Sequence, residues 1–292
     1  MTTPILRGRT FLVTGANSGI GRALSEALGS QHATIILGGR SIERTMPVVE
    51  AIRAAYPEAV ADFLHLDLAD WTSVRRAAED LRRRYSTLDV LVNNAGVAGT
   101  KGVSADGYHL TYATNHLGPF LLTQLLLPAL RSARQGRIVN VSSVAHKSVK
   151  QFDWTLLTTA PSRLNGNFRD YSATKLMNIL HAKELARRLA GTPTTTYALH
   201  PGGVASNIWR ELPGILQWLL KLFLISNEKG ARTPFYCATA PELAAASGNY
   251  YDRESEASPS DLADSPDLAR ELWERSLQET GAPNTVYATR ER

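Results

Sequence analysis

The stretch FLVTGANSGIG, residues 11–21, decides the fold of this chain. A strand-length apolar run is followed directly by Gly15, Gly19 and Gly21, where an amphipathic stretch of helical length begins. Such glycines allow a sharp turn from strand to helix and a close approach of the backbone to an anion, which the free N–H groups of the helix start can bind. The stretch therefore predicts a pyrophosphate site for a dinucleotide; a tight turn with incidental glycines is the competing interpretation.

Strands and helices alternate along most of the chain. Apolar runs of strand length recur at residues 11–13, 34–37, 63–66, 90–92, 138–141 and 196–199. Amphipathic stretches of helical length lie between them, at residues 21–30, 42–55, 71–85, 115–131 and 171–190. This order predicts an α/β fold, a doubly wound parallel sheet of the Rossmann type, in which ligands bind at the carboxyl ends of the strands.

The alternation weakens after residue 200. A helix is expected at residues 227–240, a short strand at 248–251 and a last helix at 268–279. The segment 205–226 contains ILQWLLKLFLIS, residues 215–226, which is apolar on more than one helical face and too short to span a bilayer. Three interpretations stay open: packing against the core or a second subunit, a lid over a hydrophobic substrate, or shallow contact with a membrane surface.

Composition limits the class of protein. With 292 residues, 43% of them apolar and 20% charged, the chain is expected to form a single domain over residues 1–292. The net charge of +5 is modest and the arginines are scattered, so nucleic-acid binding is not expected. Cys237 is the only cysteine, and no Cys or His cluster has metal-site spacing. This favours a cytoplasmic location and argues against a bound metal.

The beginning of the chain also bears on location. The first strand-like run starts within about ten residues, which leaves no room for a signal peptide or a transmembrane segment. Neither is therefore expected.

The end of the second strand indicates which cofactor binds. There the sequence LGGR, residues 37–40, offers Arg40 and no carboxylate. A carboxylate at this place would bind the ribose 2′-hydroxyl of NAD, whereas a guanidinium suits the 2′-phosphate of NADP. Arg40 could also be a solvated residue at the start of a helix, but the missing acid and the present arginine both favour NADP.

Tyr171 and Lys175 are four residues apart in YSATK, so a helix places them on one face. A free tyrosine has a pKa near 10 and is a poor acid or base at neutral pH, whereas a nearby ammonium stabilises the phenolate and lowers that pKa. The lysine also has the reach to bind a nicotinamide ribose. The spacing alone arises often by chance, and the position after the fifth strand makes the pair a candidate for proton transfer.

Short polar side chains follow three further strands. The fifth strand ends at Ser142 and Ser143, and Ser143 is preferred as the hydroxyl that meets a substrate oxygen, although serines at strand ends are commonly turn formers. NNAG, residues 93–96, follows the fourth strand beside the expected adenosine site. Asp67 follows the third strand, where it either contacts adenine or caps the next helix.

Taken together, these motifs resemble the short-chain dehydrogenase/reductase family over nearly the whole chain. The resemblance rests on TGANSGIG, NNAG, Asn115, Ser143, YSATK and HPGGVASNI, in the order and spacing of that family. TNHLGPFLLT, RIVNVSSVAH, HAKELARRL and SGNYYD further resemble its retinol dehydrogenase-like branch.

The resemblance implies a role for each matching residue. Tyr171 would be the general acid or base, Lys175 would tune its pKa, Ser143 would orient a carbonyl, and Asn115 would hold a helix open for a proton-relay water. The implied cofactor-binding residues are Gly15, Asn17, Ser18, Gly19, Ile20, Gly21, Arg40, Asp67, Leu68, Asn94, Ala95, Gly96, Tyr171, Lys175, Pro201, Gly202, Val204 and Ser206.

The chain departs from the family pattern in two ways. Ser143 and Tyr171 are further apart than in the plainest members, so residues 144–170 are expected to form an inserted loop beside the site. The membrane anchor of many animal retinol dehydrogenases is also not expected here, so a membrane-bound retinoid is not inferred. The apolar residues of helices 115–131 and 171–190 either pack only within the core of their own chain or also pack between subunits of a homodimer or homotetramer, as in many members.

Three functions compete at this point. The first is an NADPH-dependent reductase of a hydrophobic small-molecule aldehyde or ketone. The second is an NADP-binding regulator or scaffold that has lost its chemistry, which the presence of Ser143, Tyr171 and Lys175 disfavours. The third is a sugar-nucleotide epimerase or dehydratase, which would need a larger C-terminal part than the residues that follow His200.

Overall fold

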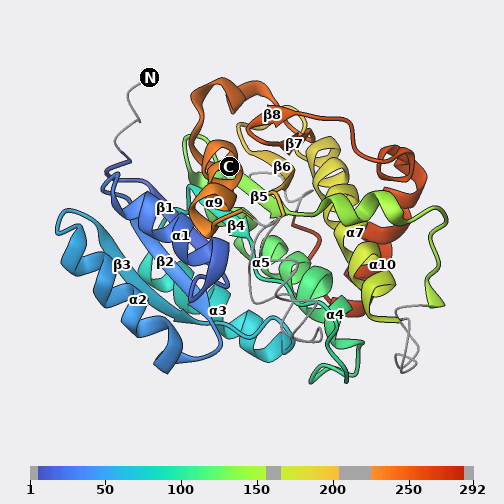
Figure 1. Cartoon of the computed structure of the whole chain (residues 1–292), viewed down its shortest axis with the longest axis horizontal. Coiled ribbons are helices and arrows are strands. Elements are labelled where there is room, and N and C mark those ends of the chain that lie inside the picture. Colours follow the sequence, from blue (N-terminus) through green and yellow to red (C-terminus); the bar gives the residue numbers. More distant parts are fainter. Residues whose placement is uncertain (1–5, 156–165, 204–224, 286–292) are drawn as a thin grey trace.

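The computed structural model of the chain describes residues 6–155, 166–203 and 225–285. Strands in these residues form one sheet in the order β3-β2-β1-β4-β5-β6-β7-β8 (Figure 1). The strands from β1 to β7 pair in parallel, and β8 pairs antiparallel with β7. Their bounds are β1 (Thr10–Thr14), β2 (Thr34–Gly39), β3 (Val60–His65), β4 (Val90–Asn93), β5 (Arg137–Val141), β6 (Thr195–His200), β7 (Tyr250–Asp252) and β8 (Ser255–Glu256).

The sheet is doubly wound, as the sequence predicts. Its order runs from β1 through β2 to β3 on one side and from β4 to β7 on the other, so the direction of winding reverses between β1 and β4. Loops after neighbouring strands part at such a point, and a ligand crevice forms outside the carboxyl ends of the strands.

The long helices cover both faces of the sheet (Figure 1). One apolar cluster joins the strands to α1, α2 and α9, and a second joins them to α3, α5, α7 and α10. The helices are α1 (Gly19–Gly29), α2 (Ile42–Ala55), α3 (Trp71–Arg84), α4 (Leu110–Tyr112), α5 (Gly118–Ser132), α7 (Gly166–Arg188), α9 (Asn227–Thr239) and α10 (Pro266–Thr280), with shorter turns η1 (Ala113–Leu117), η2 (Val144–Ser148), η4 (Pro241–Ala245) and η5 (Asp261–Asp264).

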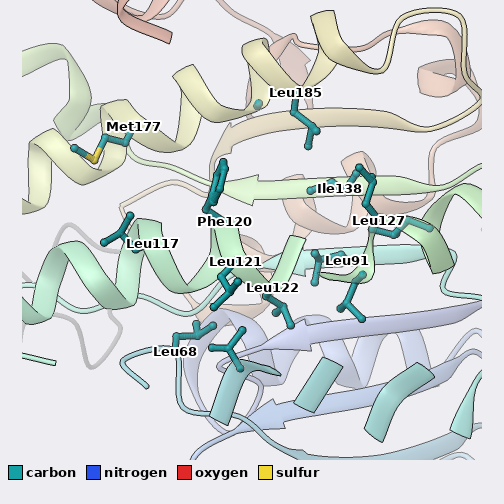
Figure 2. Close-up of a cluster of buried hydrophobic side chains, with 14 of the residues drawn as sticks. Leu68, Leu91, Leu117, Phe120, Leu121, Leu122, Leu127, Ile138, Met177 and Leu185 are labelled. Atoms are coloured by element: carbon teal, nitrogen blue, oxygen red, sulfur yellow. The ribbon is translucent and has the colours of Figure 1, made fainter. Parts of the chain in front are cut away.

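Alternate residues of each central strand enter the two clusters. In β1, Phe11 and Val13 belong to the cluster with α1, α2 and α9, while Leu12 belongs to the other. Strands buried on both faces carry continuous apolar runs, which explains why the strand signal is so clear in this sequence. Figure 2 shows part of the second cluster, where Leu91 of β4 and Ile138 of β5 gather with side chains of α5 and α7.

Helix α10 adds a further layer over α7 and α5. The ring of Trp273 lies 5.0 Å from that of Phe120 on α5 and 6.0 Å from that of His181 on α7, measured between centroids. The helices that the sequence offers as a subunit interface thus bury part of their surface against their own chain, and the oligomeric state stays a prediction. Within the described residues, every helix is too short or too polar to cross a membrane.

The predicted helix 115–131 differs from the structure at its start. Residues Ala113–Leu117 form a π-helical turn, and α5 runs only from Gly118 to Ser132. The side chain of Asn115 makes two hydrogen bonds to the main chain of Val97. Its Oδ1 accepts from the N of Val97 at 2.8 Å, and its Nδ2 donates to the carbonyl oxygen of Val97 at 2.9 Å. The wider π-helical turn thus lies where Asn115 holds the loop after β4, and a pattern of apolar residues does not report such a turn.

The expected loop at residues 144–170 is wrong at both ends. Residues Val144–Ser148 form the 3₁₀ turn η2, capped by Ser143, whose hydroxyl accepts from the main-chain N of Ala145 at 3.2 Å. Helix α7 begins at Gly166, so Tyr171 lies in its second turn rather than at its start. Residues 156–165 lie outside the described residues, as do Val204, Ser206 and all of the predicted lid segment 205–226 except Ile225 and Ser226. Strand β8 lies in a polar tail and was not predicted.

Candidate active site

A cleft of about 810 Å³ lies at the carboxyl ends of β1, β2, β4, β5 and β6. The predicted residues that line it are Gly15, Asn17, Ser18, Gly19, Ile20, Gly21, Arg40, Asp67, Leu68, Asn94, Ala95, Gly96, Ser143, Tyr171, Lys175, Pro201 and Gly202. Asn115 is buried behind the wall of this cleft and does not line it. The structure thus brings together residues that are far apart in the sequence.

The loop after β1 has no space for a side chain at Gly15 or Gly21. A Cβ on Gly15 would lie 2.9 Å from Cα of Ala95, and one on Gly21 would lie 2.4 Å from the carbonyl oxygen of Gly15. Gly15 and Gly19 also have φ of 66° and 56°, which glycine adopts without strain. Ser18 caps α1 with its backbone, but its hydroxyl bonds no N–H of the first turn. The start of α1 therefore keeps free donors that face the cleft.

Asn94 and Thr14 hold this loop in place. The Asn94 amide donates to the carbonyl oxygen of Thr14 at 2.8 Å. The Thr14 hydroxyl in turn accepts from the main-chain N of Asn94 and of Ala95, both at 3.0 Å. Thr14 was not predicted as a site residue, although it stands directly before the first glycine of the loop.

The far end of the cleft carries two arginines. Arg40 follows β2, and Arg44 lies on the first turn of α2; both line the cleft, and Arg44 was not predicted. Glu43 also lines this end, where the Ser41 hydroxyl donates to it at 2.7 Å and lowers its pKa. The far end of the cleft thus combines two guanidinium groups with one carboxylate that stays ionised.

Asp67 does not cap α3. That helix is capped by Asp70, whose Oδ1 accepts from the main-chain N of Thr72 at 2.8 Å and of Ser73 at 3.2 Å. Asp67 instead accepts from the N of Ala69 at 2.9 Å and lines the cleft. Of the two roles that the sequence left open, the structure excludes the cap.

Tyr171 and Lys175 lie together on α7, but their electrostatics differ from the prediction. The Lys175 ammonium donates to the carbonyl oxygen of Val141 at 2.9 Å and lies 5.5 Å from the centroid of the Tyr171 ring. Burial raises the pKa of Tyr171 to about 12, and a hydrogen bond from Ser143 opposes this rise. Burial also lowers the pKa of Lys175 to about 8. Because the ammonium points at the main chain and both groups are buried, the expected lowering of the Tyr171 pKa by Lys175 is not seen.

The hydroxyls of the two serines that follow β5 have different partners. Ser142 is 2% exposed and its hydroxyl donates to the carbonyl oxygen of Lys175 at 2.6 Å, so it fixes α7 to the sheet. The Ser143 hydroxyl faces the cleft and bonds with the Tyr171 side chain. The geometry therefore agrees with the preference for Ser143.

Asn115 reaches the site through its neighbours. Besides its two bonds to Val97, its amide Nδ2 lies 3.1 Å from the hydroxyl of Thr174, which precedes Lys175 on α7. A Cβ on Gly96 would lie 3.3 Å from Nζ of Lys175 and 3.4 Å from Oδ1 of Asn115. The amide of Asn115 therefore joins the loop after β4 to α7 directly behind the lysine.

The burial of Lys175 predicts that stability depends on pH. Its pKa falls from 10.5 to about 8 on folding, so between these values the unfolded chain binds more protons than the folded one. The free energy of unfolding is therefore expected to rise with pH in this window, by up to about 1.4 kcal/mol per pH unit. Lys175→Met, which cannot titrate, should lack this rise.

Chemical unfolding of both proteins at intervals from pH 7.5 to 10.5 checks this. Burial raises the pKa of Tyr171 and of Cys237, which lowers the stability of both proteins as the pH rises through the ordinary values of these groups. The difference between wild type and variant isolates the lysine. Parallel curves would show that burial does not lower the pKa of Lys175.

Comparison with known proteins gives concordant matches. A family model described as short chain dehydrogenase matches residues 9–156. Dehydrogenase/reductase SDR family member 13 of Bos taurus is 38% identical, over 94% of this chain and 74% of that protein. Human retinol dehydrogenase 11 is 36% identical, over 97% of this chain and 89% of that protein.

Solved structures share the fold. A crystal structure of an uncharacterised protein from Mycobacterium paratuberculosis superposes with a TM-score of 0.77 at 30% identity, covering 96% of each chain. The RhlG–NADP active-site complex of Pseudomonas aeruginosa superposes with a TM-score of 0.69 at 22% identity, covering 90% of this chain and all of the other.

Proposed function

The chain belongs to the short-chain dehydrogenase/reductase family, in its retinol dehydrogenase-like branch, and from this membership we propose that it reduces hydrophobic aldehydes or ketones with NADPH. The observation that carries the proposal is the meeting of Ser143, Tyr171 and Lys175 in the same cleft as the glycine loop. Members of this family are oxidoreductases acting on alcohol and carbonyl carbons, so the reaction type follows from membership. NADP, the direction and the substrate class are the proposed part.

The cleft suits a dinucleotide along its whole length. The absence of side-chain space at Gly15 and Gly21 and the free donors at the start of α1 fit a pyrophosphate held against the backbone. Arg40 and Arg44 at the far end supply the charge that a 2′-phosphate needs. Asp67 and Leu68 would border the adenine, and Pro201 and Gly202 the nicotinamide. The same fold holds NADP in the RhlG complex.

The protein's own groups handle the proton and the carbonyl. NADPH, when bound, supplies the hydride that forms the new C–H bond. Tyr171, with its pKa raised to about 12, keeps its proton at neutral pH and gives it to the carbonyl oxygen as the alcohol forms. Ser143 donates a hydrogen bond to the same oxygen and orients it. Lys175 holds α7 against β5 through Val141 and supplies positive charge beside the phenol ring.

Apolar side chains at the mouth of the cleft support a hydrophobic substrate. Phe168 and Val144 line the cleft together with Tyr171 and are 52% and 45% exposed. Val97, Ala98 and Ala145 line the cleft as well. Large exposed apolar groups that gather at a cleft mark binding surfaces.

Lengthening an aliphatic aldehyde from butanal to decanal is therefore expected to raise kcat/KM. Each methylene that becomes buried stabilises the transition state by up to about 0.8 kcal/mol, which raises kcat/KM by about fourfold, until the apolar surface is covered. Phe168→Ser should flatten this dependence because it removes part of that surface. The measurement is NADPH oxidation by each aldehyde, followed at 340 nm.

Val60→Ser is the matched control, since Val60 is 49% exposed on β3 and does not line the cleft. A rise of kcat/KM that survives unchanged in Phe168→Ser would place the apolar surface elsewhere, with the predicted lid at residues 205–226 as the next candidate. Trp218→Ala and Phe223→Ala would then be tested in the same series. A flat profile in the wild type would reject a long aliphatic substrate.

A cofactor-binding protein without chemistry is the second candidate. It requires the loss of at least one catalytic group, and all of them are present in the cleft. The experiment that decides is NADPH oxidation against a broad panel of aldehydes and ketones, with identification of the products. NADPH binding without turnover of any of them would favour the silent protein.

A further inference from the structure

His146 is a buried histidine that the proposed mechanism does not use. It lies in η2, three residues after Ser143, and is 0% exposed. Its ring packs edge-on against Tyr250 of β7, with centroids 5.2 Å apart. This histidine lies three residues after the serine that is proposed to orient the carbonyl. It either stabilises the fold alone or also sets the position of that serine.

The two ring nitrogens of His146 bond to main-chain atoms of different segments. Nδ1 lies 2.6 Å from the carbonyl oxygen of Ser143, and Nε2 lies 3.1 Å from the main-chain N of Ser260, which precedes η5. Carbonyl oxygens only accept and main-chain N–H groups only donate, so the proton must be on Nδ1 and the lone pair on Nε2. The partners therefore fix one neutral tautomer. A protonated ring would set a donor against the N–H of Ser260.

The groups that face His146 favour the neutral ring. Burial lowers its pKa, and Lys147 on its own turn acts in the same direction, while the bond to Ser143 opposes them. From β6, His200 faces it and contributes no negative charge; the pKa of His200 is itself lowered by burial, although Asp252 on β7 opposes this. His200 in turn accepts from the main-chain N of Val144 at 3.4 Å, so two histidines hold the turn that follows Ser143.

We propose that His146 is a positioning residue for Ser143. Its Nδ1–H holds the Ser143 carbonyl and so fixes the backbone from which the Ser143 hydroxyl reaches Tyr171 and the substrate oxygen, while the bond from the main-chain N of Ser260 to Nε2 keeps the ring in the tautomer that carries this hydrogen. This inference rests on the proposed function, because it assigns a role to His146 in the same reaction. A shift of a few tenths of an ångström in Ser143 weakens a hydrogen bond that is strongest in the transition state.

Two substitutions separate the two bonds. In His146→Asn the side-chain amide stands near the place of Nδ1, so it keeps the donor to Ser143 and loses the bond to Ser260. In His146→Gln it stands near the place of Nε2, so it keeps the bond to Ser260 and loses that to Ser143. Both variants lose the same ring packing against Tyr250. The Asn variant is expected to keep kcat within about threefold of wild type, and the Gln variant to lose about tenfold.

The experiment measures kcat and KM with NADPH and decanal, the dissociation constant of NADPH, and Tm. Both variants are also made in a Ser143→Ala background. If His146 acts through Ser143, His146→Gln lowers kcat only where Ser143 is present, and NADPH affinity is unchanged. Equal kcat in the two variants, or an equal loss in the Ser143→Ala background, overturns the proposal. The proposal is also overturned if the Gln variant binds no NADPH or shows no melting transition, because His146 would then have a purely structural role. A wild type that reduces no carbonyl compound would instead reject the proposed function itself.

Discussion

Tyr171→Phe is expected to lower kcat for carbonyl reduction by about 10² to 10⁴ while the dissociation constant of NADPH changes by less than about threefold. The phenol ring stays in its packed position on α7, so the cleft keeps its shape. The proton that the carbonyl oxygen must receive is lost, and Lys175 on the same helix donates instead to the carbonyl oxygen of Val141. Steady-state kinetics with decanal and fluorescence titration with NADPH measure the two effects.

Tyr112→Phe provides the matched control for this experiment. Tyr112 is also a buried tyrosine, its hydroxyl donates to Glu279 at 2.7 Å, and it does not line the cleft. This variant also removes a buried tyrosine hydroxyl and its hydrogen bond, but at a position outside the cleft. It should therefore change Tm more than kcat. A Tyr171→Phe enzyme with kcat near that of the control would eliminate Tyr171 as the proton donor.

Arg40→Asp is expected to shift cofactor preference by about 100-fold or more from NADPH towards NADH. In the wild type the guanidinium at the end of β2 would pair with the 2′-phosphate; the aspartate repels that phosphate and can accept a hydrogen bond from a ribose hydroxyl. Arg44→Asp should shift the preference in the same direction, because Arg44 lines the same end of the cleft. The measurement is kcat/KM for each cofactor at a fixed aldehyde concentration and two ionic strengths.

Arg76→Asp controls for the change in net charge. Arg76 is exposed on α3, which lies on the other face of the sheet from α2, and it does not line the cleft. The preference of the Arg76→Asp variant between NADPH and NADH should equal that of the wild type. A wild type that already prefers NADH would refute the assignment of NADP, whatever the variants do.

Most strands could be predicted from the sequence because burial on both faces gives them apolar runs, such as residues 11–13 in β1. Helix boundaries were harder. The π-helical turn at Asn115 leaves no trace in the apolar pattern, and the start of α7 at Gly166 lies within an insertion that has no periodic pattern. Strand β8 has two exposed residues and owes its place to pairing with β7.

The candidate site could be predicted where one residue type at one position is required. Glycines at 15 and 21 have no substitute because the backbone comes too close. Residues that act through tertiary contacts were missed: Thr14 braces the loop after β4, Arg44 approaches Arg40 only once α2 is folded, and His200 joins β6 to the turn after Ser143. The pKa of Tyr171 was predicted in the wrong direction because the sequence shows the spacing of Lys175 but not its burial or its bond to Val141.

Transfer of a labelled hydrogen tests the central claim most directly. The protein is incubated with NADPH that carries deuterium at both hydrogen positions of C4 of the nicotinamide, together with decanal, and the product is analysed by mass spectrometry. We expect decan-1-ol with one deuterium on the carbinol carbon, and at least about 100-fold less of it in the same time with Tyr171→Phe. Binding of labelled NADPH without deuterium in the product of decanal, or of any aldehyde or ketone of the panel, would contradict the account.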